Sequence, residues 1–123
     1  MNRRLIIVLV LMLELFLPPF ARAQAPINVQ IEVNFLLGFI EGSRCEFNRN
    51  GTWQDSKVAQ MHLRDKYNYL VARNLIQTTE DFIEKAGTES SLSGQPYEVR
   101  CQGGATVTSK QWLYDELARF RTF

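Results

Sequence analysis

The sequence has few of the residues from which metal and redox sites are built. Its 123 residues include one histidine, His62, and two cysteines, and no C-x-x-C spacing occurs. A structural zinc site needs four ligands, mostly cysteine and histidine, so we expect none. The motifs of esterases, zinc proteases, phosphate loops, dinucleotide folds and EF-hands are also missing. We therefore expect no bound cofactor or metal.

The chain also carries little net charge. Its 14 basic and 13 acidic residues give a formal charge of +1. Three arginines and one glutamate fall in residues 1–23, which leaves 11 basic and 12 acidic residues in the remainder, a net charge of −1. A nearly neutral domain lacks the positive field that attracts nucleic acid or an anionic membrane. A nucleic-acid partner is therefore not expected.

The N-terminal segment has the layout of a secretory signal peptide. Two arginines precede a 13-residue apolar run, residues 5–17, that one glutamate interrupts. Two prolines end the run, and Ala21 and Ala23 are the small residues that a signal peptidase reads. The pattern predicts a cleaved signal peptide over residues 1–23, a periplasmic location, and a single mature domain over residues 24–123.

Alternative interpretations of this segment are weaker. A 13-residue helix rises ~20 Å, short of the ~30 Å hydrocarbon core of a bilayer, and Glu14 adds a further cost. A retained membrane anchor is therefore disfavoured, and we expect no stable span after cleavage. The Arg3-Arg4 pair suggests the twin-arginine route, but the apolar run directly behind it favours the general route. Cleavage after Ala25 is a second choice because it leaves Pro26 beside the cut.

Both cysteines, Cys45 and Cys101, fall in the predicted mature domain. In an oxidising compartment, two cysteines in a small domain most simply form a disulfide. The chain-entropy model gives such a bridge ~4 kcal/mol of stabilisation. A zinc site or a reactive thiol is the alternative, and neither has the necessary companion residues in this sequence.

Apolar periodicity and turn residues predict an α+β fold, with about four helices packed on a small antiparallel β-sheet and one disulfide. Each predicted strand places its cysteine on its apolar side, so antiparallel pairing sets Glu46 near Arg100. Helices are expected over 27–41, 55–73, 78–86 and from 108 to about 120, and strands over 45–49 and 97–101.

Two local expectations concern Gly38 and Trp53. A glycine inside a helix costs ~1 kcal/mol against alanine, so we expect Gly38 to admit the close approach of another element. Asn50-Gly51 is a strong tight-turn signal. A two-residue hairpin would turn Trp53 away from Phe47, so we expect the turn to lead quickly into the next helix instead.

Three polar clusters are candidate site residues. Arg49 and Asn50 lie on the turn beside Trp53, where they could hold an anion or a sugar. His62 borders the apolar stripe of the long helix and suits a general base or a packed, hydrogen-bonded histidine. A serine-rich loop offers hydroxyls for anion binding, nucleophilic catalysis or turn capping. The candidate binding residues are Arg49, Asn50, His62, Ser90, Ser91 and Ser93.

The order of these segments resembles a family of small exported proteins of Gram-negative bacteria, the domain of unknown function 5329. The resemblance covers residues 29–121 and is carried by the combination, since each piece alone is weak. It implies an envelope location and no particular activity. Its segments are Phe47-x-Arg49-Asn50-Gly51, His62-Leu63-Arg64-x-Lys66, Asp81-Phe82-Ile83, Ser90-Ser91-x-Ser93-Gly94-x-Pro96-Tyr97 and Trp112-Leu113.

The leading expectation is a non-enzymatic periplasmic binding or accessory module for a protein partner or a small anionic ligand. A small hydrolase is the first alternative, with His62 as base and Ser91 or Ser93 as nucleophile. A purely structural envelope protein is the second.

Overall fold

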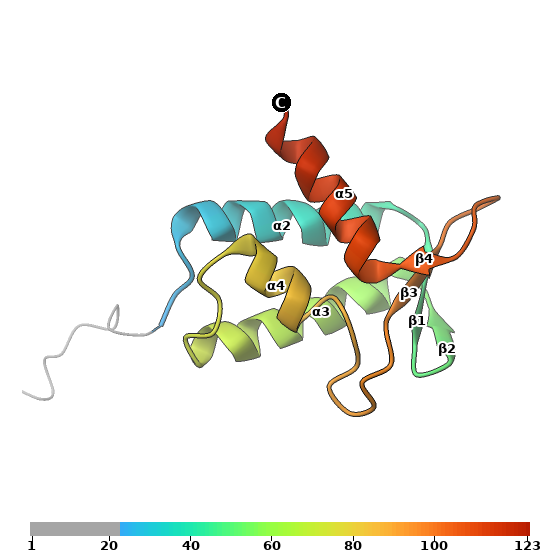
Figure 1. Ribbon diagram of the computed structural model, residues 1–123, viewed down its shortest axis with the longest axis horizontal. Helices are drawn as coiled ribbons and strands as arrows, with labels where there is room; N and C mark the ends of the chain where they lie inside the picture. The colour runs from blue at the N-terminus through green and yellow to red at the C-terminus, as the bar shows by residue number, and fades with distance from the viewer. Residues whose placement is uncertain (1–22) are drawn as a thin grey trace, which may run out of the picture.

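The computed structural model describes residues 23–123 (Figure 1), so the predicted signal peptide lies outside the described residues except for Ala23. The described part of the chain confirms the predicted α+β class, with four helices and a small antiparallel sheet. None of these helices is long and apolar enough to cross a bilayer. They are α2 (Ile27–Gly42), α3 (Ser56–Ala72), α4 (Thr79–Lys85) and α5 (Ser109–Arg121).

Four short strands form the sheet, in the order β2-β1-β3-β4, with every pair antiparallel. The two predicted strands are the central pair, and the two edge strands were not predicted. The sheet stands at one end of the helices, beside the beginnings of α3 and α5 (Figure 1). The strands are β1 (Glu46–Arg49), β2 (Thr52–Gln54), β3 (Glu98–Arg100) and β4 (Val107–Thr108).

Three helices begin at residues whose side chains satisfy a backbone N–H group of the first turn. Asp55 caps α3 and Thr108 caps α5, each by accepting from the amide three residues further on. At α4, Thr78 and Asp81 form a reciprocal capping box. Because unpaired N–H groups at a helix start need acceptors, these residues explain why the predicted helix starts were correct.

The core lies between the four helices and the inner face of the sheet, and α2 contributes most to it. The apolar pattern of residues 27–41 places Ile31 on the apolar face of the helix, but this side chain is 57% exposed. The expectation for Gly38 was also wrong. Gly38 is exposed, and nothing lies within 4 Å of the position that a Cβ atom would take, so no close approach explains this glycine. Fully buried core side chains are Val33, Leu36, Leu37, Ile40, Phe82, Ile83, Val99 and Leu113.

The expectation that the Asn50-Gly51 turn leads directly into a helix was also wrong. A two-residue hairpin forms, with Asn50 and Gly51 both at positive φ. Trp53 does lie opposite Asn48 rather than Phe47. Its ring is covered by the guanidinium of Arg100, whose Cζ lies 3.8 Å from the ring centroid. Arg100 lies on β3 and reaches Trp53 on β2 across the intervening strand β1. This cation–π contact offsets the free-energy cost of keeping the indole outside the core.

Cys45 and Cys101 form the predicted disulfide beside the central strand pair. The ladder sets Glu46 opposite Arg100, as expected, and the two are joined by a hydrogen bond of 3.2 Å. Continuing the same register by one residue beyond each end places Cys45 opposite Cys101 and Arg49 opposite Tyr97. Alternate residues of a strand share a face, so the bridge and the Arg49–Tyr97 pair lie at the two ends of one face.

Candidate functional site

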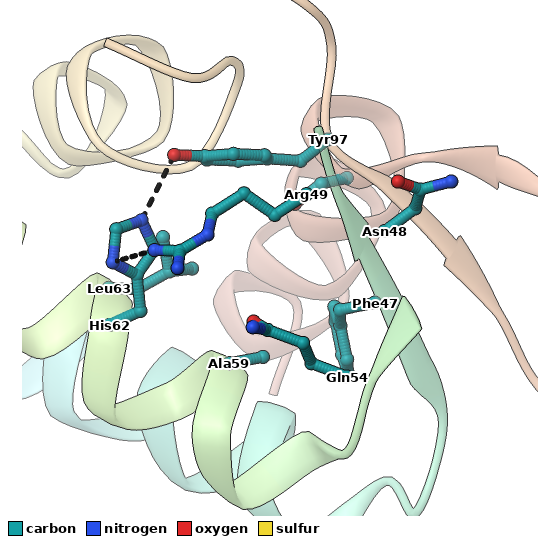
Figure 2. Close-up of a pocket in the computed structure, with 9 residues that line it drawn as sticks. Phe47, Asn48, Arg49, Gln54, Ala59, His62, Leu63 and Tyr97 are labelled. Carbon is teal, nitrogen blue, oxygen red and sulfur yellow. Dashed lines mark hydrogen bonds between the residues drawn. The ribbon is translucent and has the colours of Figure 1, made fainter. Parts of the chain in front are cut away.

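Four polar side chains form a continuous chain of hydrogen bonds between the sheet and α3. Figure 2 shows three of them, Arg49, His62 and Tyr97. Arg49 of β1 contacts His62 of α3, with 2.7 Å between Nη1 and Nδ1. The other ring nitrogen, Nε2, lies 3.1 Å from the Tyr97 hydroxyl. Lys66, one helical turn after His62, donates to the same hydroxyl at 3.1 Å and to the Glu89 carbonyl at 3.0 Å.

The proton positions in this chain follow from Arg49. A guanidinium has only donors, so Nδ1 of His62 must accept and the neutral ring carries its proton on Nε2. His62 therefore donates to the Tyr97 oxygen, which also accepts from Lys66. Both lone pairs of that oxygen are then in use, and the Tyr97 hydroxyl proton has no acceptor among the described residues. The arrangement leaves one donor available for a bound acceptor.

The surroundings keep His62 neutral. Its burial and the positive charges of Arg49 and Lys66 lower the pKa of His62 below its usual value of 6.5, against an opposing effect of Asp65. Burial also lowers the pKa of Lys66 and raises the pKa of Tyr97. All three shifts have desolvation as the main cause, which shows how far this cluster is withdrawn from water.

Arg49 and Lys66 combine partial burial with the lack of a carboxylate partner. Both are half-buried, and no carboxylate oxygen of the described residues lies within 4 Å of either. Arg100, the other half-buried cation of the described chain, contacts Glu46 at 3.2 Å, and the remaining unpaired cations, such as Lys57, are exposed to water. The charge of Glu89 opposes the lowering of the Lys66 pKa only in part. Two partly desolvated positive charges with no carboxylate within 4 Å make this part of the surface a favourable place for an anion.

Two hollows lie on either side of His62. The first is an apolar slot beneath Arg49, between β1, α3 and Tyr97 (Figure 2), with about 20 Å³ of space. That volume holds about one water molecule. The second is an open groove of about 390 Å³, which is large enough for a small organic ligand. It is lined by His62, Asp65, Lys66, Tyr69, Leu70, Lys85 and Ser91.

The structure joins four of the six predicted residues in two side-chain contacts. Arg49 meets His62, and the Ser93 hydroxyl donates to Asn50 Oδ1 at 2.5 Å, which ties the serine loop to the hairpin turn. Ser90 is buried, and its oxygen accepts from the backbone amides of Leu92 and Ser93 within the loop. It therefore has the turn-stabilising role that a loop serine commonly plays.

The arrangement does not favour the hydrolase alternative. Both nitrogens of His62 are engaged by Arg49 and Tyr97 rather than by a serine and an aspartate. Ser93 is committed to Asn50. Ser91 is exposed and shares the groove with His62, but no hydrogen bond joins the two within the described chain. A nucleophile needs its base within hydrogen-bond reach.

Sequence reasoning did not assign Tyr97 and Lys66 to the site, although both fall in the segments that it singled out. Lys66 follows His62 by four residues, which places the two on neighbouring turns of one helix face. Tyr97 follows from the strand register, because pairing Cys45 with Cys101 pairs Arg49 with Tyr97 four residues away. Helix spacing for Lys66 and strand register for Tyr97 were therefore the sequence signals that could have assigned them to the site.

Comparison with known proteins gives a family but no activity. Residues 27–121 match the model of a family of unknown function, DUF5329. The chain is 34% identical over 93 residues to an uncharacterized protein of Salmonella typhimurium, YfeK, and the match covers 75% of this chain and 74% of that protein. No solved structure matches. The chain therefore belongs to the DUF5329 family, as the resemblance of its polar segments suggested.

Proposed function

We propose that this protein is an exported, non-enzymatic binding or accessory module whose site takes an anionic group. The site consists of Arg49, His62, Lys66 and Tyr97, and the group belongs to a small ligand or to a partner protein. One observation carries the proposal: the half-buried charges of Arg49 and Lys66 have no carboxylate partner in the described chain.

The hydrogen-bond chain supports this role. Arg49 uses one of its five N–H groups on His62, and its others have no partner among the described residues. Neutral His62 keeps the guanidinium in place without adding a third positive charge. Charge-assisted hydrogen bonds from arginine and lysine to carboxylate or phosphate are among the strongest that a protein makes. The cluster therefore offers an anion two charges that are already positioned.

Thermal denaturation in a series of anions tests the proposal. The mature protein is melted at pH 7.5 and constant ionic strength, with phosphate, sulfate or acetate replacing chloride. We expect at least one of these anions to raise the midpoint by several degrees, because a ligand at 100 times its Kd stabilises the folded state by ~2.7 kcal/mol. Arg49→Gln and Lys66→Gln should each remove most of that rise.

Lys57→Gln is the matched control, because Lys57 is an exposed lysine on the same helix that also has no salt bridge among the described residues. Its anion-dependent shift should equal that of the wild type. An equal shift in all four proteins would show a general salt effect and overturn the site. Since Arg49→Gln also loses a hydrogen bond to His62, the comparison uses the anion-induced change and not the midpoint itself.

Export to the periplasm is the second part of the proposal. It is supported by the charged head, apolar run and small residues of positions 1–23 and by the disulfide. Fractionation of cells that express the full chain, followed by mass spectrometry of the N-terminal peptide, tests it. We expect a periplasmic protein that begins at Gln24. A cytoplasmic protein that retains Met1 and has two free thiols would contradict the proposal.

A further inference from the structure

We infer that the ligand of this site is an organic monoanion in which a carboxylate or sulfonate group is joined to an apolar body. The body lies in the groove between α3, the end of α4 and the serine loop. The inference rests on the proposed function for the charged head group and adds the chemistry of the remainder of the ligand. The observation that carries the inference is the position of the groove, which follows α3 from His62 and Lys66 to Tyr69 and Leu70.

The head group is placed by Lys66, which lines the groove, and by the Tyr97 hydroxyl that Lys66 contacts. Lys66 has three N–H groups and uses one on the Tyr97 hydroxyl and one on the Glu89 carbonyl. Its third N–H group and the unpaired hydroxyl proton of Tyr97 lie within a single hydrogen-bonded cluster. One carboxylate has two oxygens and can accept from both donors. A neutral acceptor gains the same hydrogen bonds without the charge attraction.

The body is placed by the walls of the groove beyond Lys66. Tyr69 and Leu70 are the aromatic and the aliphatic residue that line it there. Tyr69 is 57% exposed, and the guanidinium of Arg73 stacks on its ring at 3.4 Å from the centroid. This contact holds the aromatic ring in one position while much of it stays open to solvent. An exposed, fixed aromatic ring beside a cationic pocket is suited to packing against an apolar ligand.

The charges at the rim favour a single negative charge. Lys85 lines the groove but already contacts the Leu75 carbonyl at 2.9 Å and the Asp81 carboxylate at 3.7 Å. Asp65 lines the groove as well and has no cation within 4 Å among the described residues. A second anionic group on the ligand would be repelled by Asp65. The groove therefore selects against dianions.

Three small molecules separate the contributions of head and body. Phenylacetate has both, acetate has the head alone, and benzyl alcohol has the body alone. Binding is measured at pH 7.5 by NMR titration of the backbone amides of α3 and the serine loop. We expect phenylacetate to bind about tenfold more tightly than acetate, because covering roughly half of a phenyl ring is worth that factor. Benzyl alcohol should bind more weakly than phenylacetate, so that it occupies less than half of the protein at a concentration equal to the Kd of phenylacetate.

Two variants test the assignment to this groove. Tyr69→Ala should bring phenylacetate affinity down toward that of acetate and leave acetate unchanged, whereas Lys66→Gln should weaken both. Phe123→Ala is the matched control, since Phe123 is a fully exposed aromatic residue at the C-terminus. It should behave as the wild type. Alanine is a good helix former, so the Tyr69 variant is expected to fold, which circular dichroism checks.

The outcomes distinguish this inference from the proposed function. If acetate and phenylacetate bind equally and both depend on Lys66, the anion site stands and the apolar body is refuted. If neither binds, in the NMR titration or in the anion melts, both proposals fail. If benzyl alcohol binds as tightly as phenylacetate, the groove is an apolar site without charge recognition and the inference is again refuted.

Discussion

Removing the disulfide tests how much of the fold depends on one covalent bond. Cys45 and Cys101 are 56 residues apart in the sequence. In the chain-entropy model, freeing a loop of that length costs about 4 kcal/mol of unfolding free energy. A domain of this size has a total of ~5–15 kcal/mol. The Cys45→Ala/Cys101→Ala variant should therefore lose a large share of its stability, and its melting midpoint should fall by ~15–30 °C.

Urea unfolding followed by tryptophan fluorescence measures this loss. Reduction of the wild type provides a matched control, because breaking the bridge chemically should reproduce the midpoint of the double variant. Reductant should leave the double variant itself unchanged. A loss below ~1 kcal/mol, or a wild type that melts at the same temperature with and without reductant, would refute the view that the bridge constrains the unfolded chain.

Three further substitutions should change the free energy of unfolding in a direction that the structure predicts. Because the pKa of His62 is lowered in the folded state, wild-type stability should fall as the pH drops below about 6.5, and His62→Gln should remove that slope in urea titrations. Gly38→Ala fills open space at an exposed position of α2 and should raise the unfolding free energy by ~1 kcal/mol. Gly87→Ala would bring a Cβ within 2.7 Å of buried Leu113 Cδ1. This substitution should lower the unfolding free energy by ~1–3 kcal/mol in the same assay.

The helices were predictable because their signals are local. Asp55, Thr78 and Thr108 begin helices by bonding amides within three residues, so a short stretch of sequence contains both partners. The hairpin was missed for the opposite reason. The ring of Trp53 is covered by Arg100, which lies 47 residues later in the sequence and reaches it only across the folded sheet. From the sequence, placing the Trp53 indole outside the core was expected to be costly, because the residue that covers it is far away in the chain.

In the candidate site, too, some contacts could be predicted from the sequence and others could not. The Cys45–Cys101 bridge, once assumed, fixes the strand register and with it the pairing of Arg49 with Tyr97. The spacing of His62 and Lys66 follows from helix geometry alone. The contact between Asn50 and Ser93 could not be predicted in this way. It joins a turn to an irregular loop, and neither has a periodic pattern that fixes where its side chains point.

The bridge and the candidate site are linked through the ladder that they share. The disulfide holds β1 and β3 together at one end, and the hydrogen-bond chain from Arg49 through His62 to Tyr97 lies at the other. Both strands have three or four residues, so few backbone hydrogen bonds hold their register between the two ends. A one-residue slip would turn Arg49 to the opposite face of the sheet, away from His62. If the protein is exported, as we propose, its oxidising compartment supplies the bond that keeps this site assembled on such short strands.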